Sequence, residues 1–194
     1  FDVGLASGDG FFDAGRIVVE GDHFATLGDK KRWTKGGSSS PEDFLAHSPS
    51  NRIKMVDQLH GYKSNDLFML LNNIGGDGDN VYPFNSYDDR WHYDVSKLRQ
   101  WNDLFAYMQS KGVACHLVFG EGEKDNKLSL SDMQRKLYIR EMVARFSWLP
   151  GLMWNISEEY DGHQWPLSPA TVEKYAGWIK EYDPEVWERA DKFL

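Results

Sequence analysis

The chain has 194 residues, of which 41% are hydrophobic and 27% charged, a balance typical of a folded globular protein. Its formal net charge of −8 argues against nucleic acid or an anionic membrane as a partner, because both attract positively charged surfaces. Aromatic residues make up 14%, with eight Trp, and such side chains either fill a core or stack on sugars and bases.

The apolar runs, the cysteine content and the N-terminal residues narrow the class of protein further. No apolar run reaches the roughly 18 residues that a membrane-spanning helix needs, and a single cysteine, Cys115, excludes an intrachain disulfide. The chain begins with Phe1 rather than Met and lacks the basic and apolar regions of a signal peptide. We therefore expect a processed chain or a piece of a longer protein.

The first residues predict an antiparallel hairpin. Two β-prone runs, 16–20 and 23–27, flank a Gly-Asp turn. We expect them to belong to a β-rich N-terminal segment over residues 1–30, followed by the main domain over 31–194.

Strands and helices are predicted to alternate along the rest of the chain. Apolar runs of strand length lie near 32–37, 67–73, 113–120 and 151–158. Helix signals occur at Ser40-Pro41, over Ile53–Tyr62, from Asp94 or Ser96 to Met108, from a capping box at Ser131 to Phe146, and from Ser168 to Tyr182. In the helix that follows Ser131, the spacing predicts an apolar face of Met133, Leu137, Met142 and Phe146.

This order predicts parallel βαβ units. The fold class is therefore α/β, and four strand–helix units are about half of a TIM (β/α)8 barrel, which takes roughly 250 residues. Either the sheet is open, or the sequence holds about the first half of such a barrel.

The fourth strand ends in two adjacent carboxylates, Glu158 and Glu159. A buried lone carboxylate is costly, so we expect them where the strand meets a cleft, at the carboxyl edge of the sheet. Strand alternation puts Asn155, Ser157 and Glu159 on one side, facing a barrel interior, and Trp154 and Glu158 on the other.

Three further residues at strand ends and loops are candidates for contacts with a ligand, each with a structural alternative. Glu121 ends the third strand and is either a substrate-contacting acid or a solvated loop acid. Asn73 ends the second strand and either contacts a ligand or shapes a turn. Trp91 is either a stacking platform for a ligand or a packed loop anchor.

No metal site or other cofactor is expected. The stretch 77–79, Asp-Gly-Asp, lacks the later Glu and the register of a calcium loop. His116 lies inside a predicted strand, and we interpret it as a core or barrel-lining residue rather than a ligand.

The run Trp154-Asn155-Ile156-Ser157-Glu158-Glu159 resembles the end of strand four in clan A glycoside hydrolases. In that pattern the acid/base Glu follows a Trp by five residues, which is the position of Glu159. Glu158 occupies the usual place of Asn, which is a departure from the pattern. Further runs, 72–78, 88–91, 94–98 and 135–138, are similar to a bacterial group of predicted glycosidases. Those proteins carry a β-rich N-terminal domain and a collagen-binding-like C-terminal domain around a TIM barrel.

The resemblance implies a secreted or periplasmic enzyme that hydrolyses a plant or algal polysaccharide with retention. Glu159 would be the general acid/base, and a second carboxylate about 5 Å away would attack the anomeric carbon. In the clan that nucleophile follows strand seven, which this sequence lacks, so none is assigned. The candidate substrate-binding residues are Glu121, Glu158, Asn73, Asn155 and Trp91. A carbohydrate is the expected partner, while the oligomeric state stays open.

Two other functions remain open from the sequence. The first is a non-catalytic carbohydrate-binding barrel, in which the acids only accept hydrogen bonds from hydroxyls. The second is another barrel enzyme, such as an aldolase or a metal-dependent hydrolase. That reading needs a Schiff-base Lys or His ligands at strand ends, and none of the four predicted strands ends that way.

Overall fold

A four-stranded parallel sheet is the centre of the fold. The computed structural model describes residues 10–38, 42–76, 78–121, 130–161 and 166–183. The strands of this sheet lie side by side in the order of the chain, and each pairs in parallel with the next. They are β4 (Gly37–Ser38), β5 (Asp66–Leu70), β6 (Ala114–Val118) and β7 (Leu152–Asn155). The prediction of an α/β fold with parallel strands is confirmed.

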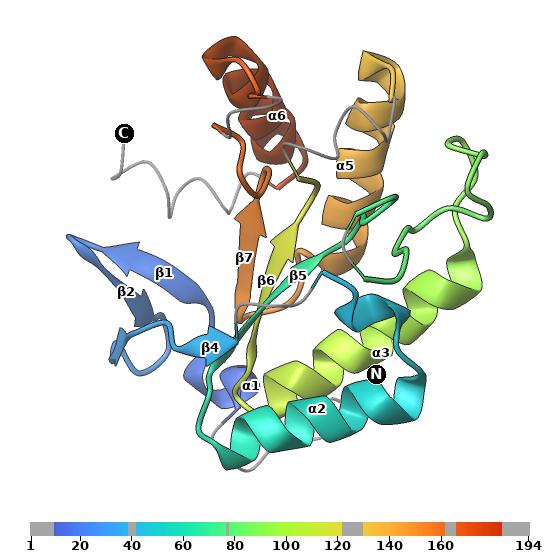
Figure 1. Ribbon diagram of the computed structural model, residues 1–194. Helices are drawn as coiled ribbons and strands as arrows, with labels where there is room; N and C mark the ends of the chain where they lie inside the picture. Colours follow the sequence, from blue (N-terminus) through green and yellow to red (C-terminus); the bar gives the residue numbers. More distant parts are fainter. Residues whose placement is uncertain (1–9, 39–41, 77, 122–129, 162–165, 184–194) are drawn as a thin grey trace.

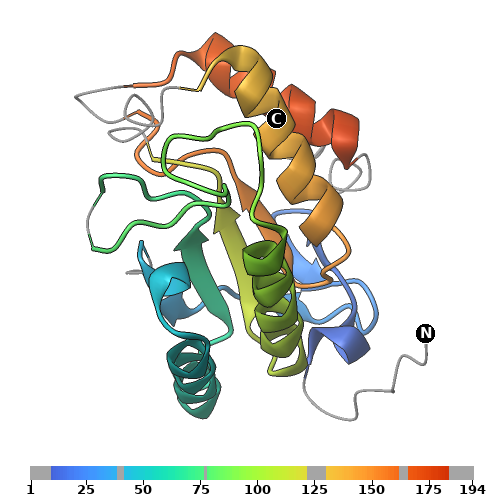
Figure 2. The ribbon, with the colours of Figure 1, turned by 90° about the vertical axis from the view of Figure 1, so that its right-hand side faces the viewer.

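Four helices cover one face of this sheet, as Figure 2 shows from the helix side. They are α2 (Pro49–Gly61), α3 (Val95–Ser110), α5 (Asp132–Phe146) and α6 (Pro169–Tyr182). Alternate residues of the strands, such as Met69, Leu117 and Leu152, join the apolar faces of these helices in the main core. This is the packing that strand periodicity demands, because side chains i and i+2 share a face.

A small antiparallel sheet lies on the other side of the strands (Figures 1 and 2). Its strands are β1 (Ile17–Glu20), β2 (His23–Thr26) and β3 (Arg32–Trp33), preceded by the single-turn helix α1 (Phe11–Ala14). The β1–β2 pair confirms the predicted hairpin. Phe11, Ile17 and Ala114 form a second, smaller core between this sheet and the parallel strands.

The strand predicted over 32–37 is divided between the two sheets. Trp33 pairs with Phe24 in the antiparallel sheet, whereas Gly37 pairs with Asp66 in the parallel one. A Cβ on Gly37 would lie 1.9 Å from the carbonyl oxygen of Asp66, so only glycine permits this close approach.

Each long helix begins at a polar side chain that accepts a backbone hydrogen bond. Ser48 caps α2 through the amide of Asn51, and Pro49 follows it at the first helical position. The Ser40-Pro41 signal lies outside the described residues, and the part of the chain after it forms a short 3-10 turn, η1 (Phe44–Ala46). The capping box predicted at Ser131 is confirmed.

For α3 the structure decides between the two predicted caps. The Asp94 carboxylate accepts from the amide of Lys97 at 2.9 Å, and Ser96 lies within the helix. We expect Asp94→Ala to lower the free energy of unfolding by about 1 kcal/mol, the usual cost of losing an N-cap, and Ser96→Ala to change it by less than about 0.5 kcal/mol. Urea unfolding of both variants measures the difference. Equal effects of the two substitutions would contradict the assignment of Asp94 as the cap.

The predicted apolar face of α5 is partly wrong. Met133 is 66% exposed, whereas Tyr138, Ile139 and Val143 are buried together with the predicted Met142. Met133 belongs to the first turn of α5, which begins at Asp132. The pairing of Glu141 with Arg145 on the outside is confirmed, with 2.6 Å between Nη2 and Oε1.

The described sheet is open, with β4 and β7 at its edges. That the chain holds the first half of a barrel, and that its domains divide at residue 30, stay predictions. In the part of the chain that the structure describes, every helix is too short or too polar to cross a membrane.

Candidate functional site

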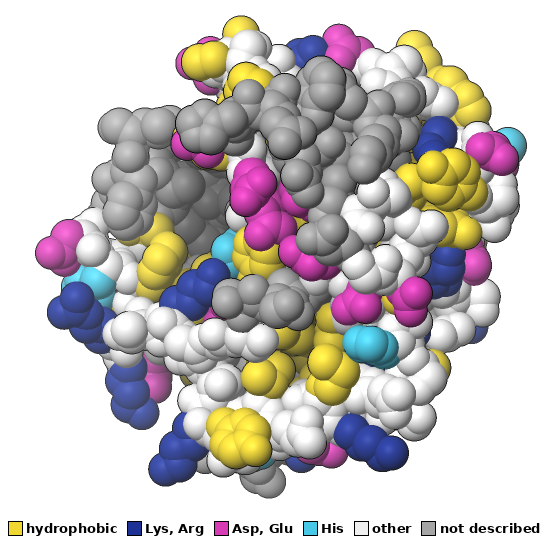
Figure 3. Space-filling model, viewed as in Figure 1, with side chains coloured by type: hydrophobic (Ala, Val, Ile, Leu, Met, Phe, Trp, Pro, Cys, Tyr) yellow, Lys and Arg dark blue, Asp and Glu magenta, His cyan; other side chains and the backbone are white. Residues whose placement is uncertain are grey.

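The carboxyl edge of the sheet brings Glu121 and Glu158 side by side. They follow β6 and β7 and form a parallel bridge, in which the amide of Glu158 donates to the carbonyl of Gly120 at 3.0 Å. Bridged residues of neighbouring strands lie about 4.8 Å apart. Glu121 is only 5% exposed and Glu158 is half-buried. Acidic side chains gather over the upper ends of β6 and β7 in Figure 3, on the surface that the carboxyl edge presents.

Glu159 differs from Glu158 in conformation and exposure. Its φ angle is +47°, in the left-handed region that non-glycine residues rarely adopt, and its side chain is exposed. The alternation that placed it with Asn155 and Ser157 does not hold, because β7 ends at Asn155 and the chain turns at Glu159. The turn, rather than the strand register, therefore determines the orientation of the Glu159 side chain.

The residues between the strand and the two acids hold this turn. The Asn155 side-chain oxygen accepts from the amide of Ser157 at 3.1 Å, and the Ser157 hydroxyl donates to the carbonyl of Glu158 at 2.9 Å. The Asn155 side chain therefore shapes the path of the chain to Glu158, and its contact with substrate stays a prediction.

Aromatic packing fixes the same strand ends from the helix side. Trp154 stacks on Phe119 with 5.1 Å between ring centroids, and the Tyr138 hydroxyl of α5 donates to the carbonyl of Phe119 at 3.0 Å. The predicted orientation of Trp154 toward the helices is thus confirmed. Phe119 and Tyr138 were not identified from the sequence as residues that support the site. The position of Phe119, directly before Gly120 and Glu121 at the strand end, was a signal that could have indicated this role.

Asn73 and Trp91 belong to the connection between β5 and α3. Asn73 is fully buried, pairs through its backbone with Val81 and donates from Nδ2 to the carbonyl of Asp79 at 3.4 Å. These bonds favour the turn-shaping interpretation of Asn73. Trp91 is 52% exposed, and its amide donates to Asp89 at 2.9 Å, so its indole is available to a ligand.

On the face of the sheet away from the helices lies a charged cluster that the sequence did not reveal. The Lys35 ammonium is 2.6 Å from Nδ1 of His116 and 3.3 Å from the carboxylate of Asp66, the first residue of β5. Burial raises the pKa of Asp66 despite the nearby Lys35. Burial, and secondarily the Lys35 charge, lowers the pKa of His116 to about 4.

This geometry makes His116 a neutral acceptor of a hydrogen bond from Lys35. Its ring also meets Phe68 edge-on at 4.9 Å between centroids. These contacts agree with the interpretation of His116 as a residue lining the sheet rather than a ligand. Across the described ranges, no three His, Cys, Asp or Glu side chains are arranged to hold a metal ion.

The fold is similar to that of glycoside hydrolases of known structure. A protein of Bacteroides vulgatus ATCC 8482 described as a "putative glycoside hydrolase" superposes on 92% of this chain with a TM-score of 0.76 and 15% identity, and 38% of that protein is covered. A family 5 glycoside hydrolase from the same organism matches 89% of the chain with a TM-score of 0.63 and 10% identity, again over 38% of its own length.

The β-mannanase of the blue mussel Mytilus edulis matches 88% of the chain with a TM-score of 0.56 and 13% identity, over 61% of the mannanase. The chain thus spans less than two thirds of each of these structures. No protein-family model matches the chain, and a search of curated proteins found no match. At these identities the likeness shows a glycoside-hydrolase-type fold and leaves the activity to be proposed.

Proposed function

We propose that this chain carries the acid/base part of a glycoside hydrolase that acts on a plant or algal polysaccharide or oligosaccharide. The observation that carries the proposal is the acidic edge of the sheet, where Glu121, Glu158 and Glu159 follow two adjacent parallel strands. Active sites of parallel α/β folds lie at this edge. The likeness in fold to three glycoside hydrolase structures supports the same conclusion.

In the proposed mechanism Glu159 protonates the leaving glycosidic oxygen and later deprotonates the attacking water. Its exposed side chain, on a turn with positive φ, is accessible to a polysaccharide. Glu121 and Glu158 accept hydrogen bonds from sugar hydroxyls, and Trp91 offers an indole face for stacking. The nucleophile of the retaining reaction would come from the second half of the proposed barrel. The proposal also includes a β-rich domain before the barrel and a collagen-binding-like domain after it. Secretion or periplasmic location is part of the proposal.

The function is tested by incubating the full-length protein with a panel of plant and algal polysaccharides. Mannan belongs in the panel, because one structure of similar fold is a β-mannanase. We expect release of reducing sugar from at least one polymer, and proton NMR of the first product to show the anomeric configuration of the substrate. Binding without cleavage would favour the alternative, a non-catalytic carbohydrate-binding barrel. Inverted product would exclude the retaining mechanism.

A further inference from the structure

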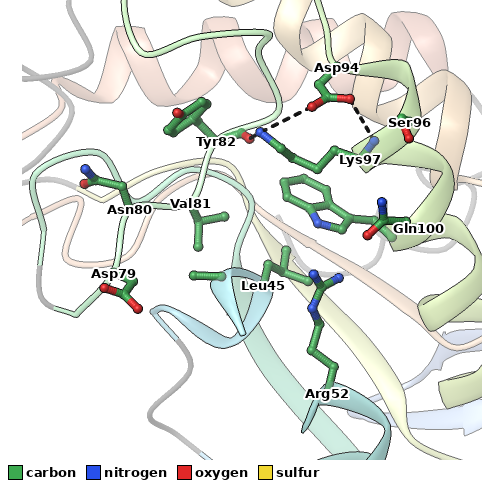
Figure 4. Close-up of a pocket in the computed structure, with 12 residues that line it drawn as sticks. Leu45, Arg52, Asp79, Asn80, Val81, Tyr82, Asp94, Ser96, Lys97 and Gln100 are labelled. Atoms are coloured by element: carbon green, nitrogen blue, oxygen red, sulfur yellow. Dashed lines mark hydrogen bonds and ion pairs between the residues drawn. The ribbon is translucent and has the colours of Figure 1, made fainter. Parts of the chain in front are cut away.

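A pocket of about 530 Å³ lies between α2 and α3, apart from the acidic edge. Figure 4 shows its walls: the 3-10 turn η1 and α2 on one side, the first turns of α3 on another, and the segment 79–82 closing it. The volume is within the roughly 300–1,000 Å³ of small-molecule sites. The pocket is therefore large enough for a ligand of monosaccharide size.

A buried cation without a counter-ion lines this pocket. Arg52 of α2 is 7% exposed, and its Nε donates to the carbonyl of His47 at 2.7 Å. Within the described ranges its guanidinium forms no ion pair, and burial lowers its pKa. Burying a charge without a partner is costly. An anion bound beside the Arg52 guanidinium would offset this cost.

A second donor in the same wall also lacks an acceptor. Trp101 of α3 lines the pocket and is 1% exposed, and its Nε1–H has no hydrogen-bond partner among the described residues. A guanidinium presents two parallel N–H groups that match a carboxylate or sulfate, and an indole N–H adds a third donor.

The acids that line the pocket do not satisfy Arg52. Asp94 caps α3 and lies 3.9 Å from the ammonium of Lys97, which also donates to the carbonyl of Tyr82 at 3.0 Å. Asp79 lies on the far side of the pocket from the guanidinium (Figure 4). Asp94 and Lys97 therefore neutralise each other, and the positive charge of Arg52 remains for a ligand.

We propose that this pocket binds a small ligand through one compact anionic group, a carboxylate or sulfate, held by the Arg52 guanidinium and the Trp101 indole N–H. The anionic group can belong to an acidic sugar or can be a free inorganic ion. This inference does not depend on the proposed hydrolase activity, because none of its residues belongs to the acidic edge.

The test follows the Trp101 indole N–H by two-dimensional nitrogen–proton NMR of the full-length protein, with its signal assigned through Trp101→Phe. Sodium glucuronate, sodium sulfate and neutral glucose are titrated separately at constant ionic strength. We expect a saturable shift of this signal with at least one of the two anions and none with glucose. Tighter binding of glucuronate identifies a charged sugar as the ligand, and tighter binding of sulfate identifies an inorganic ion.

Arg52→Gln is expected to lower the affinity for the anion at least tenfold, because it removes both the charge and the two parallel donors. Arg99→Gln is the matched control: it removes the same charge from an exposed position of α3 and should leave affinity unchanged. Arg52→Lys, which keeps the charge but not the planar fork, should weaken binding several-fold and covers the case in which the Gln variant does not fold. The proposal would be overturned if neither anion gave a saturable shift, or if glucose gave the same shift as the anions. Unchanged affinity in a folded Arg52 variant would also overturn it.

Discussion

Glu159→Gln in the full-length protein is expected to lower kcat on the responsive polysaccharide by about 10³-fold, within the 10²–10⁴-fold that a general acid contributes. The amide is nearly isosteric with the acid but cannot donate a proton to the leaving oxygen. A glycoside of the same sugar with a dinitrophenyl leaving group should lose much less in bond cleavage, because that group departs without protonation. The ratio of the two losses, measured by steady-state and single-turnover kinetics, separates the acid role from a general defect.

Two neighbouring acids serve as comparisons for Glu159. Asp161→Asn makes the same change of charge at an exposed position two residues later and should leave kcat within about twofold. Glu158→Gln should act mainly through substrate binding and raise KM, since the proposed role of this side chain is to accept hydrogen bonds from sugar hydroxyls. If Glu158→Gln removed turnover and Glu159→Gln did not, the acid role would belong to Glu158.

His116→Phe is expected to make the fold less sensitive to acid between pH 6.5 and 4. The pKa of His116 is lowered to about 4 in the folded protein, against about 6.5 in the unfolded chain. The neutral ring therefore contributes stability that is fully present above pH 6.5 and is lost as pH falls toward 4. The loss amounts to roughly 3 kcal/mol at most. Phe keeps an aromatic ring beside Phe68 and has no proton to take up.

The neighbours of His116 include a second titrating group, so the experiment must separate the effect of His116 from that of its surroundings. Lys35 and Asp66 form its charged surroundings, and Phe68 of β5 and Met153 of β7 flank it. Asp66 acts in the opposite direction: its raised pKa favours the folded state at low pH, a contribution lost as pH rises through that pKa. The measured quantity is therefore the difference in the free energy of unfolding between wild type and variant, from urea unfolding at several pH values. His60→Phe, at an exposed position of α2, is the control. A wild-type pH slope in His116→Phe would contradict the prediction.

Local sequence patterns were sufficient for most elements of the fold. The hairpin around Gly21, the capping box at Ser131 and the apolar runs of β5 and β6 depend on residues close in sequence, and the structure confirms each. The face of α5 depended instead on where α6 and the sheet lie, and periodicity misplaced Met133 for that reason.

The residues of the candidate site also divide into those that local sequence identifies and those that only the tertiary structure brings together. From sequence, Trp154, Glu121 and the Glu158-Glu159 pair could be assigned to strand ends, because apolar runs followed by acids mark a rim. The Lys35–Asp66–His116 cluster could not be found, since its members come from three separate segments and only parallel pairing brings them together.

By itself the sequence determined the alternation of strands and helices, the parallel order of the sheet and the carboxylates at its edge, because these follow from hydrophobic period, capping and chain connectivity. The tertiary structure alone decided where strand geometry stops. β7 ends at Asn155, Glu158 pairs with Glu121, and Glu159 turns outward with a positive φ. The physical reason is that strand pairing is interrupted after Asn155, where the amide of Ser157 donates to the Asn155 side chain rather than to a neighbouring strand. Pairing resumes only at the bridge between Glu158 and Glu121, and a partner 37 residues earlier in the chain is not visible in a local sequence pattern.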